Sequence, residues 1–295
     1  STAAAPSSSP PLDEAAASAA LRALRAAALC DAPEAVREQQ REAEELLCGL
    51  CARGVGPWLR RLAAACFVAT LTVGDSISMY SRVSEWQGAI EAKQFDKSPE
   101  AARLGTLALL GAVCRAFGGR MARAGAETIT LCARHVAKAS EWRVRAAALR
   151  CVGQCVAGAG DKLPPAGQEA VVRLALKAGG DKSIGVRDAA AQVLVEVCHA
   201  GSGRALCAAL AFDQVATLCL RALEAAPEAQ SDGAGNAETD VCAHTNCRAR
   251  HANVLTALVA AAGSDGVKMA LAQAKGKERD KLAKQVANAG RLYLA

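Results

Sequence analysis

The sequence predicts an all-α protein, an α-solenoid of the HEAT or armadillo type in which antiparallel helix pairs stack into a right-handed superhelix. The first reason is composition: hydrophobic residues make up 52% of the 295 residues, but aromatic residues only 3%. Small apolar side chains suit closely packed helices, whereas an all-β fold would use more aromatic and β-branched residues. The hydrophobic content also argues against intrinsic disorder. The second reason is an internal repeat.

The repeat is marked by arginines that each follow the previous one by 42 residues: Arg61, Arg103, Arg145 and Arg187. Apolar residues stand seven positions after each of them, at Val68, Leu110, Val152 and Leu194. A period of about 40–47 residues with two helices per unit is typical of HEAT and armadillo repeats. We therefore expect each unit to be a helix pair that buries a thin apolar face against its neighbours.

Helix start and stop signals divide the chain into these pairs. Gly54 and Gly56 end one helix and Pro57 opens the next, while Ser98 and Pro99 are expected as N-cap and first residue of a later one. The expected helices are, in order, Ala32–Ala52, Pro57–Val73, Ser76–Lys93, Ser98–Phe117, Glu127–Lys138, Glu141–Ala157, Pro165–Lys177, Ser183–His199 and Asp213–Glu224.

The domain organisation follows from this division. Residues 1–11 are expected to be a disordered tail, and residues 12–262 a solenoid of about five helix pairs. Residues 226–241, rich in Gly, Ser, Asp and Asn, interrupt the fifth pair as a loop insertion. Residues 263–295 are expected to form C-terminal helices that belong to a further repeat.

The repeated arginines are interpreted as a structural ladder. Asp181 stands in the turn before Val186-Arg187, and Val144-Arg145 repeats the pattern one unit earlier. An Asp at this place caps the following helix and accepts hydrogen bonds from an arginine of the same or a neighbouring unit. The expected ladder comprises Arg61, Arg103, Arg145, Asp181 and Arg187. The alternative is an exposed binding stripe.

No motif for catalysis, metal or cofactor binding emerges, so neither an enzyme nor a cofactor is predicted. The cluster Cys242, His244, Cys247 and His251 could supply four zinc ligands, but it lacks two separated ligand pairs held by turns. Cys48-Gly-Leu-Cys51 has no βαβ context for a redox role. Most of the 13 cysteines lie in apolar helical stretches, which indicates reduced packing residues and a cytoplasmic protein.

Partner binding is the remaining class of function. Tyr80 and Trp86 lie on one expected helix and are candidate anchors, because aromatic residues are scarce here and enriched at interface hot spots. The alternative is that both belong to the core. The net charge of +6 is modest, and acidic residues interleave with the lysines near the C-terminus, so nucleic-acid binding is a weaker alternative.

Several collinear motifs resemble the N-terminal region of the HEAT repeat-containing protein 5 family. The resemblance runs over residues 15–262, but the loop at 226–241 has no counterpart and the family's members are much longer. Its motifs are the stretch 59–78 with its Gly74-Asp75, and the segments Lys97-Ser-Pro-Glu, Phe117-Gly-Gly-Arg-Met, Asp181-Lys-Ser-Ile-Gly-Val-Arg and Ala216-Thr-Leu-Cys-Leu-Arg-Ala-Leu-Glu.

The resemblance implies a scaffold for clathrin-adaptor-dependent vesicle trafficking between endosomes and the trans-Golgi network. Its partners would be the clathrin adaptor and its accessory subunits, and it would reach membranes only through them. The alternatives are another HEAT scaffold, of the nuclear-transport-receptor or phosphatase-regulatory type, or a nucleic-acid-binding helical repeat.

Overall fold

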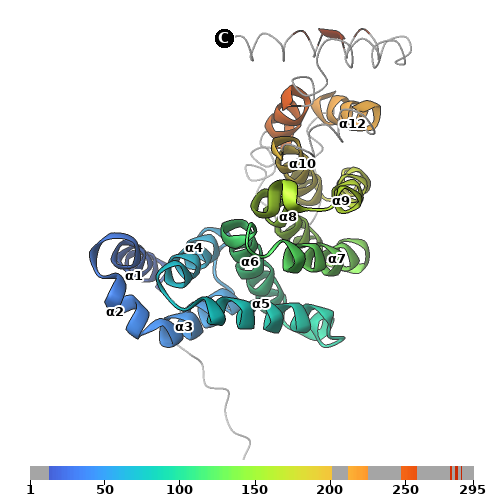
Figure 1. Cartoon of the computed structure of the whole chain (residues 1–295). Helices are drawn as coiled ribbons and strands as arrows, with labels where there is room; N and C mark the ends of the chain where they lie inside the picture. The colour runs from blue at the N-terminus through green and yellow to red at the C-terminus, as the bar shows by residue number, and fades with distance from the viewer. Residues whose placement is uncertain are drawn as a thin grey trace, which may run out of the picture.

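The prediction of an all-α fold is confirmed by a computed structural model, which describes residues 13–200, 212–224 and 247–257 and the single positions 280, 283, 284 and 287. These residues are helical or lie in turns, with no strand among them (Figure 1). The expected tail at 1–11, the loop at 226–241 and nearly all of 263–295 lie outside the described residues.

The N-terminal part begins with α1 (Glu14–Ala26), which Asp13 caps by accepting from the amides of Ala15 and Ala16. It continues through a π-helical turn (Ala27–Asp31), α2 (Pro33–Glu38) and α3 (Gln40–Ala52). The single helix expected at 32–52 is therefore broken at Gln39. Next come α4 (Pro57–Val73) and α5 (Ser76–Glu91), whose first turn is capped by Asp75.

The central part alternates long helices with short connections. A 3₁₀ turn (Phe95–Lys97) leads to α6 (Glu100–Phe117), followed by α7 (Ala122–Lys138) and α8 (Trp142–Ala159). A second 3₁₀ turn (Gly160–Lys162) precedes α9 (Pro165–Ala178) and α10 (Ile184–His199). The chain then forms α12 (Phe212–Glu224) and a helix over residues 247–257.

The starts of α6 and α7 depart from the expected start signals. Ser98 does not cap α6, since its hydroxyl donates to the Gln94 carbonyl at 3.0 Å and Pro99 takes the N-cap position. Helix α7 begins at Ala122, five residues before the expected Glu127. The intervening Ala and Arg residues form helix readily, so the start signal there is weak in the sequence.

The helices pack in two rows. Helices α4, α6, α8 and α10 contact one another in succession and form what we call the B row (Figure 1). Helices α5, α7, α9 and α12 contact one another in the same order and form the A row. Within the pairs α7–α8 and α9–α10, one helix of each row packs against the other. One continuous core runs between the rows, and its largest fully buried side chains include Phe67, Leu110, Leu149 and Leu194.

Glycines let the B-row helices approach one another closely. A Cβ atom on Gly158 of α8 would collide with the carbonyl oxygen of Cys114 on α6 and come within 2.8 Å of the Arg115 Cα atom. Gly111 of α6 lies equally close to the Gln154 side chain of α8. The Gln154 side chain can move, but the backbone of α6 cannot, so Gly158 requires a residue without a side chain. The high small-residue content reflects the tight packing of this row.

Candidate interaction surface and inter-unit clasps

The ladder arginines join neighbouring units at the start of the B-row helices. Arg103 of α6 donates two hydrogen bonds to Glu141 in the next turn, at 2.8 and 3.3 Å. Arg145 of α8 donates two to Asp181, both at 3.0 Å, and two more to the carbonyls of Ala139 and Ser140. Bidentate arginine–carboxylate pairs are strong and directional. Each pair links one unit to the next, and we call the Arg103–Glu141 and Arg145–Asp181 pairs inter-unit clasps.

These clasps shift the pKa of their carboxyl groups. Hydrogen bonds from Arg103 and from the Ser140 hydroxyl lower the pKa of Glu141 to about 2. Burial alone would raise the pKa of Asp181, but hydrogen bonds from Arg145 and from the Ser183 amide outweigh it and lower that pKa. Both acids therefore hold their negative charge well into the acidic range.

Asp181 serves two units at once. Its carboxylate accepts from the Ser183 amide at 2.8 Å, which satisfies an otherwise unpaired donor at the start of α10. Arg187 of α10 donates to the Asp181 and Lys182 carbonyls at 3.0 and 3.1 Å. The turn before α10 is thereby tied both to its own helix and to α8.

Arg61 does not take part in this arrangement, although its spacing places it in the series. It is exposed, and its Nε donates only to the Pro57 carbonyl at 3.3 Å. Arg60 instead donates to the Val55 carbonyl five residues back, as Arg145 and Arg187 do in their own turns. The repeat in space therefore begins at Arg60, one residue before the arginine that the regular interval selects.

The exposed face of the B row is concave around α8. Arg115 of α6 pairs with Glu196 of α10 at 3.0 Å, although α8 packs between these helices. Arg143 of α8 lies 3.8 Å from Glu100 of α6, and Arg250 of the helix at 247–257 lies 2.6 Å from Asp188 of α10. The Arg115–Glu196 pair spans α8, and two side chains meet across an intervening helix only where the surface curves inward. This face is the candidate interaction surface.

The two candidate anchor residues lie in different environments. Trp86 is only 7% exposed and packs against Phe67 with their rings 5.3 Å apart, so it is a core residue and cannot reach a partner. Tyr80 is 50% exposed. The sequence could not separate them, because both positions lie on one helix and differ only in which face they occupy.

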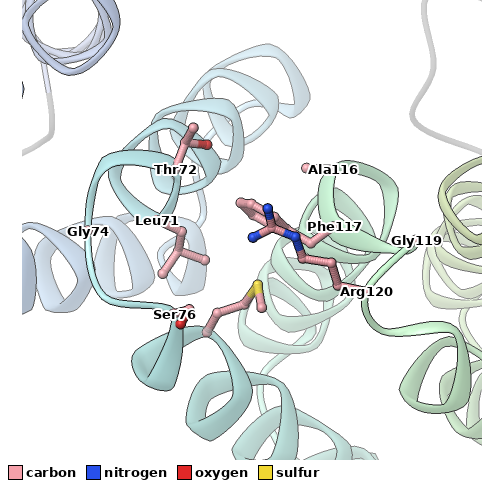
Figure 2. Close-up of a pocket in the computed structure, with 9 residues that line it drawn as sticks. Leu71, Thr72, Gly74, Ser76, Ala116, Phe117, Gly119 and Arg120 are labelled. Atoms are coloured by element: carbon pink, nitrogen blue, oxygen red, sulfur yellow. The ribbon is translucent and has the colours of Figure 1, made fainter.

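A separate cavity of about 500 Å³ lies between the C-terminal ends of α4 and α6 and the first turn of α5, and Tyr80 is not among the residues that line it. Leu71, Met79 and Phe117 supply apolar surface, and the Arg120 side chain extends past Phe117 into the space between α4 and α6 (Figure 2). The cavity suits an apolar side chain of a partner. It brings together no acid–base pair or nucleophile for catalysis.

The cysteine and histidine motifs behave as packing residues wherever they are described. Burial raises the pKa of Cys48 to about 11 and that of Cys51 to about 12, so neither is a reactive thiolate at neutral pH. Cys242 and His244 lie outside the described residues, while Cys247 and His251 are buried, with His251 Nδ1 2.7 Å from the Cys247 carbonyl. In the part that the structure describes, no cluster of His, Cys, Asp or Glu could hold a metal ion.

Fold and surface define a class: an all-helical protein of packed helix pairs with a concave, arginine-bearing face. Within the described ranges, no helix is long and apolar enough to span a membrane. No family model matches the chain. The chain is 31% identical to Protein SWEETIE of Arabidopsis thaliana over 193 residues, which is 65% of this chain and 8% of that protein. The chain thus spans about 8% of the length of the curated relative that it matches.

These comparisons correct the resemblance drawn from the short motifs. No family model links the chain to the HEAT repeat-containing protein 5 family, and the similarity found is a partial, distant one to Protein SWEETIE. Short runs of Ala, Leu, Val, Gly and Arg recur in many helical repeats because they serve the same packing needs. Such runs therefore identify a type of packing more readily than a family.

Proposed function

We propose that this chain is a protein-interaction scaffold, a HEAT- or armadillo-like solenoid that receives partner proteins on the concave face of its B row. One observation carries the proposal: Arg103 and Arg145 each clasp the turn of the following unit in the same way. Repeated clasps between stacked helix pairs are what a solenoid needs, and stacking of this kind produces extended concave surfaces suited to protein partners.

Two further observations support a binding role. The described residues with strongly raised thiol pKa values are buried in the core, so no activated nucleophile is available among them. The exposed B-row face carries arginines from α4, α6 and α8, and Arg250 of the helix at 247–257 reaches it at Asp188 of α10; arginine is enriched at protein interfaces. The role in clathrin-adaptor trafficking and the cytoplasmic location stay predictions, because nothing on the described residues bears on them.

The proposal is tested by site-specific photo-cross-linking in cells that express the chain. A photoreactive residue at Gln192 lies on the same face of α10 as Asp188 and Glu196, whereas one at the exposed Thr130 lies on α7 of the A row. We expect reproducible protein adducts, identified by mass spectrometry, from the Gln192 position and not from Thr130. Equal adducts at both positions, or none at Gln192, would contradict a B-row scaffold.

A further inference from the structure

Three arginines from three helical segments gather on the exposed face of the B row. Arg61 comes from α4, Arg150 from α8 and Arg250 from the helix at 247–257. Asp188 of α10 lies among them and pairs with Arg250. We call these four residues the B-row arginine site. Arg61 and Arg150 are exposed, and neither forms a salt bridge with any carboxylate in the part of the chain that the structure describes.

The positive charges of this site act on one another. Although the Arg150 side chain reaches solvent, desolvation by the surrounding protein lowers its pKa. Asp188 opposes this change, and Arg250 and Arg61 lower the pKa further. A guanidinium group does not lose its proton near neutral pH. The like charges therefore persist in the folded protein, where the carboxylate of Asp188, which Arg250 contacts at 2.6 Å, attracts Arg150 as well.

The neighbouring arginines of the same face are already engaged. Arg115 pairs with Glu196 and Arg143 lies near Glu100. Of the arginines named on this face, Arg61 and Arg150 thus remain without a salt bridge among the described residues, and they lie on the two helices that flank α6 (Figure 1). The small Ala147 lies one turn from both Arg143 and Arg150 on α8, and it leaves space between their side chains.

We propose that an acidic segment of a partner protein lies across α4, α6 and α8, where its carboxylates accept hydrogen bonds from Arg61 and Arg150. This inference rests on the proposed scaffold function and names the chemistry of its partner. Arginine presents its donors in a planar fork that matches a carboxylate. A nucleic acid fits less well, because it presents a charged phosphate at every nucleotide, whereas Arg115 and Arg143 are already paired with Glu196 and Glu100 and leave only a short positive surface.

The test measures binding of a fluorescently labelled, glutamate-rich peptide of about twelve residues by fluorescence anisotropy. The variant Arg61→Gln/Arg150→Gln is compared with Arg41→Gln/Arg123→Gln, which removes the same net charge from side chains that are 91% and 95% exposed on α3 and α7. We expect about a tenfold loss of affinity for the first variant and less than about twofold for the second. Affinity of the native chain should fall as salt is added.

A melting experiment separates a binding role from a structural one. Because Arg150→Gln removes both the repulsion from Arg250 and Arg61 and the attraction of Asp188, its melting temperature should stay close to that of the native chain, while its affinity for the peptide falls. A variant that melts earlier and binds less would point to a structural arginine and overturn the proposal. Arg61→Lys/Arg150→Lys keeps the charge, and it should bind more tightly than the double Gln variant.

Other outcomes also overturn the proposal: no binding by the native chain, equal losses in the two double variants, or tighter binding of a single-stranded oligonucleotide than of the peptide. The scaffold itself is judged separately. If partners cross-linked at Gln192 still bind the Arg61→Gln/Arg150→Gln variant, the scaffold stands and the acidic-segment inference fails. If the peptide binds at the arginines but no protein is cross-linked from the B row, the scaffold function fails.

Discussion

The N-terminal and central parts of the molecule join their helix pairs by different chemistry. In the centre, Arg103 and Arg145 each clasp a carboxylate in the turn of the following unit. In the N-terminal part, Arg60 reaches only the carbonyl of Val55 in its own turn, and burial lowers its pKa. The carboxylates near the corresponding place, Asp96 and Glu100, lie instead beside His135 and Arg143. That part needs another connection.

The other connection is a buried polar cluster between α3 and α5. Glu44, whose side chain is 2% exposed, accepts from Gln40 at 2.7 Å, from the Ser78 hydroxyl at 2.7 Å and from Arg82 at 3.1 Å. Gln40 also accepts from the Asp75 amide at 2.7 Å. Both parts thus join neighbouring units by buried or half-buried polar contacts. In the centre these contacts lie in the turns before B-row helices, and in the N-terminal part they lie between α3 and α5 of the A row.

The largest loss of stability is expected when Glu44, the centre of the N-terminal polar cluster, is replaced. Glu44→Ala leaves Arg82, Gln40 and Ser78 without their common acceptor, and it should lower the free energy of unfolding by about 3 kcal/mol. Glu45→Ala, next in sequence but exposed, should change it by less than about 0.5 kcal/mol. Chemical denaturation of both variants measures the difference. Similar midpoints for the two would show that the cluster does not hold α3 to α5.

The second prediction compares the packing of the two parts through glycine. Gly158→Ala places a methyl group against the Cys114 carbonyl and should destabilise the protein by about 2 kcal/mol, because α6 and α8 must move apart. Gly88→Ala on α5 meets nothing within 4 Å and should raise stability by up to about 1 kcal/mol through helix propensity. Thermal or chemical melting gives the sign of each change, and a stabilising Gly158→Ala would refute the close contact.

A double-mutant cycle on the Arg145–Asp181 clasp should give a coupling free energy of intermediate size. Arg145→Met and Asp181→Asn, alone and together, are expected to yield a coupling of about 1–2 kcal/mol, since the pair is bidentate and its side chains are less than 20% exposed. In the N-terminal part, Arg60→Met should cost less than about 1 kcal/mol, because it removes one hydrogen bond to a carbonyl. A coupling near zero for the central pair would remove the distinction between the two parts.

The smallest expected effect is a dependence of the free energy of unfolding on pH. The pKa of Glu141 is lowered to about 2 in the folded protein from an ordinary value of 4.5. The unfolded state therefore binds a proton first, so the stabilisation by Glu141 is complete above about pH 5 and is lost as the pH falls from there towards 2. The stability difference between the native chain and Glu141→Gln should shrink over that range. A difference that stays constant from pH 7 to pH 3 would contradict the clasp.

Much of the fold could be predicted from the sequence, because proline and glycine mark the ends of several helices. The bounds of α4 agree with the prediction to the residue, since Pro57 and Gly74 leave little choice. Helix α7 was placed less well, since its start at Ala122 has no capping side chain. The break between α2 and α3 at Gln39 could not be predicted, because no proline or glycine marks it.

The candidate surface could be predicted only in part. Arg103, Arg145 and Asp181 were found by their spacing, but Arg60 was missed in favour of Arg61, because a regular interval in sequence tolerates a shift of one residue in space. Arg150 carries no repeat signal at all. Its role depends on the curvature that brings α4 and α8 towards one another, and curvature arises from the packing of many residues and not from any motif.

The most direct test of a B-row interaction surface is hydrogen exchange of the native chain, followed by mass spectrometry, with and without the glutamate-rich peptide. We predict slower exchange in α4, α6 and α8 when the peptide is bound, and unchanged exchange in α5, α7 and α9. Slowing confined to the A-row helices, or no slowing at a peptide concentration that saturates the anisotropy signal, would contradict the assignment of the concave face as the binding surface.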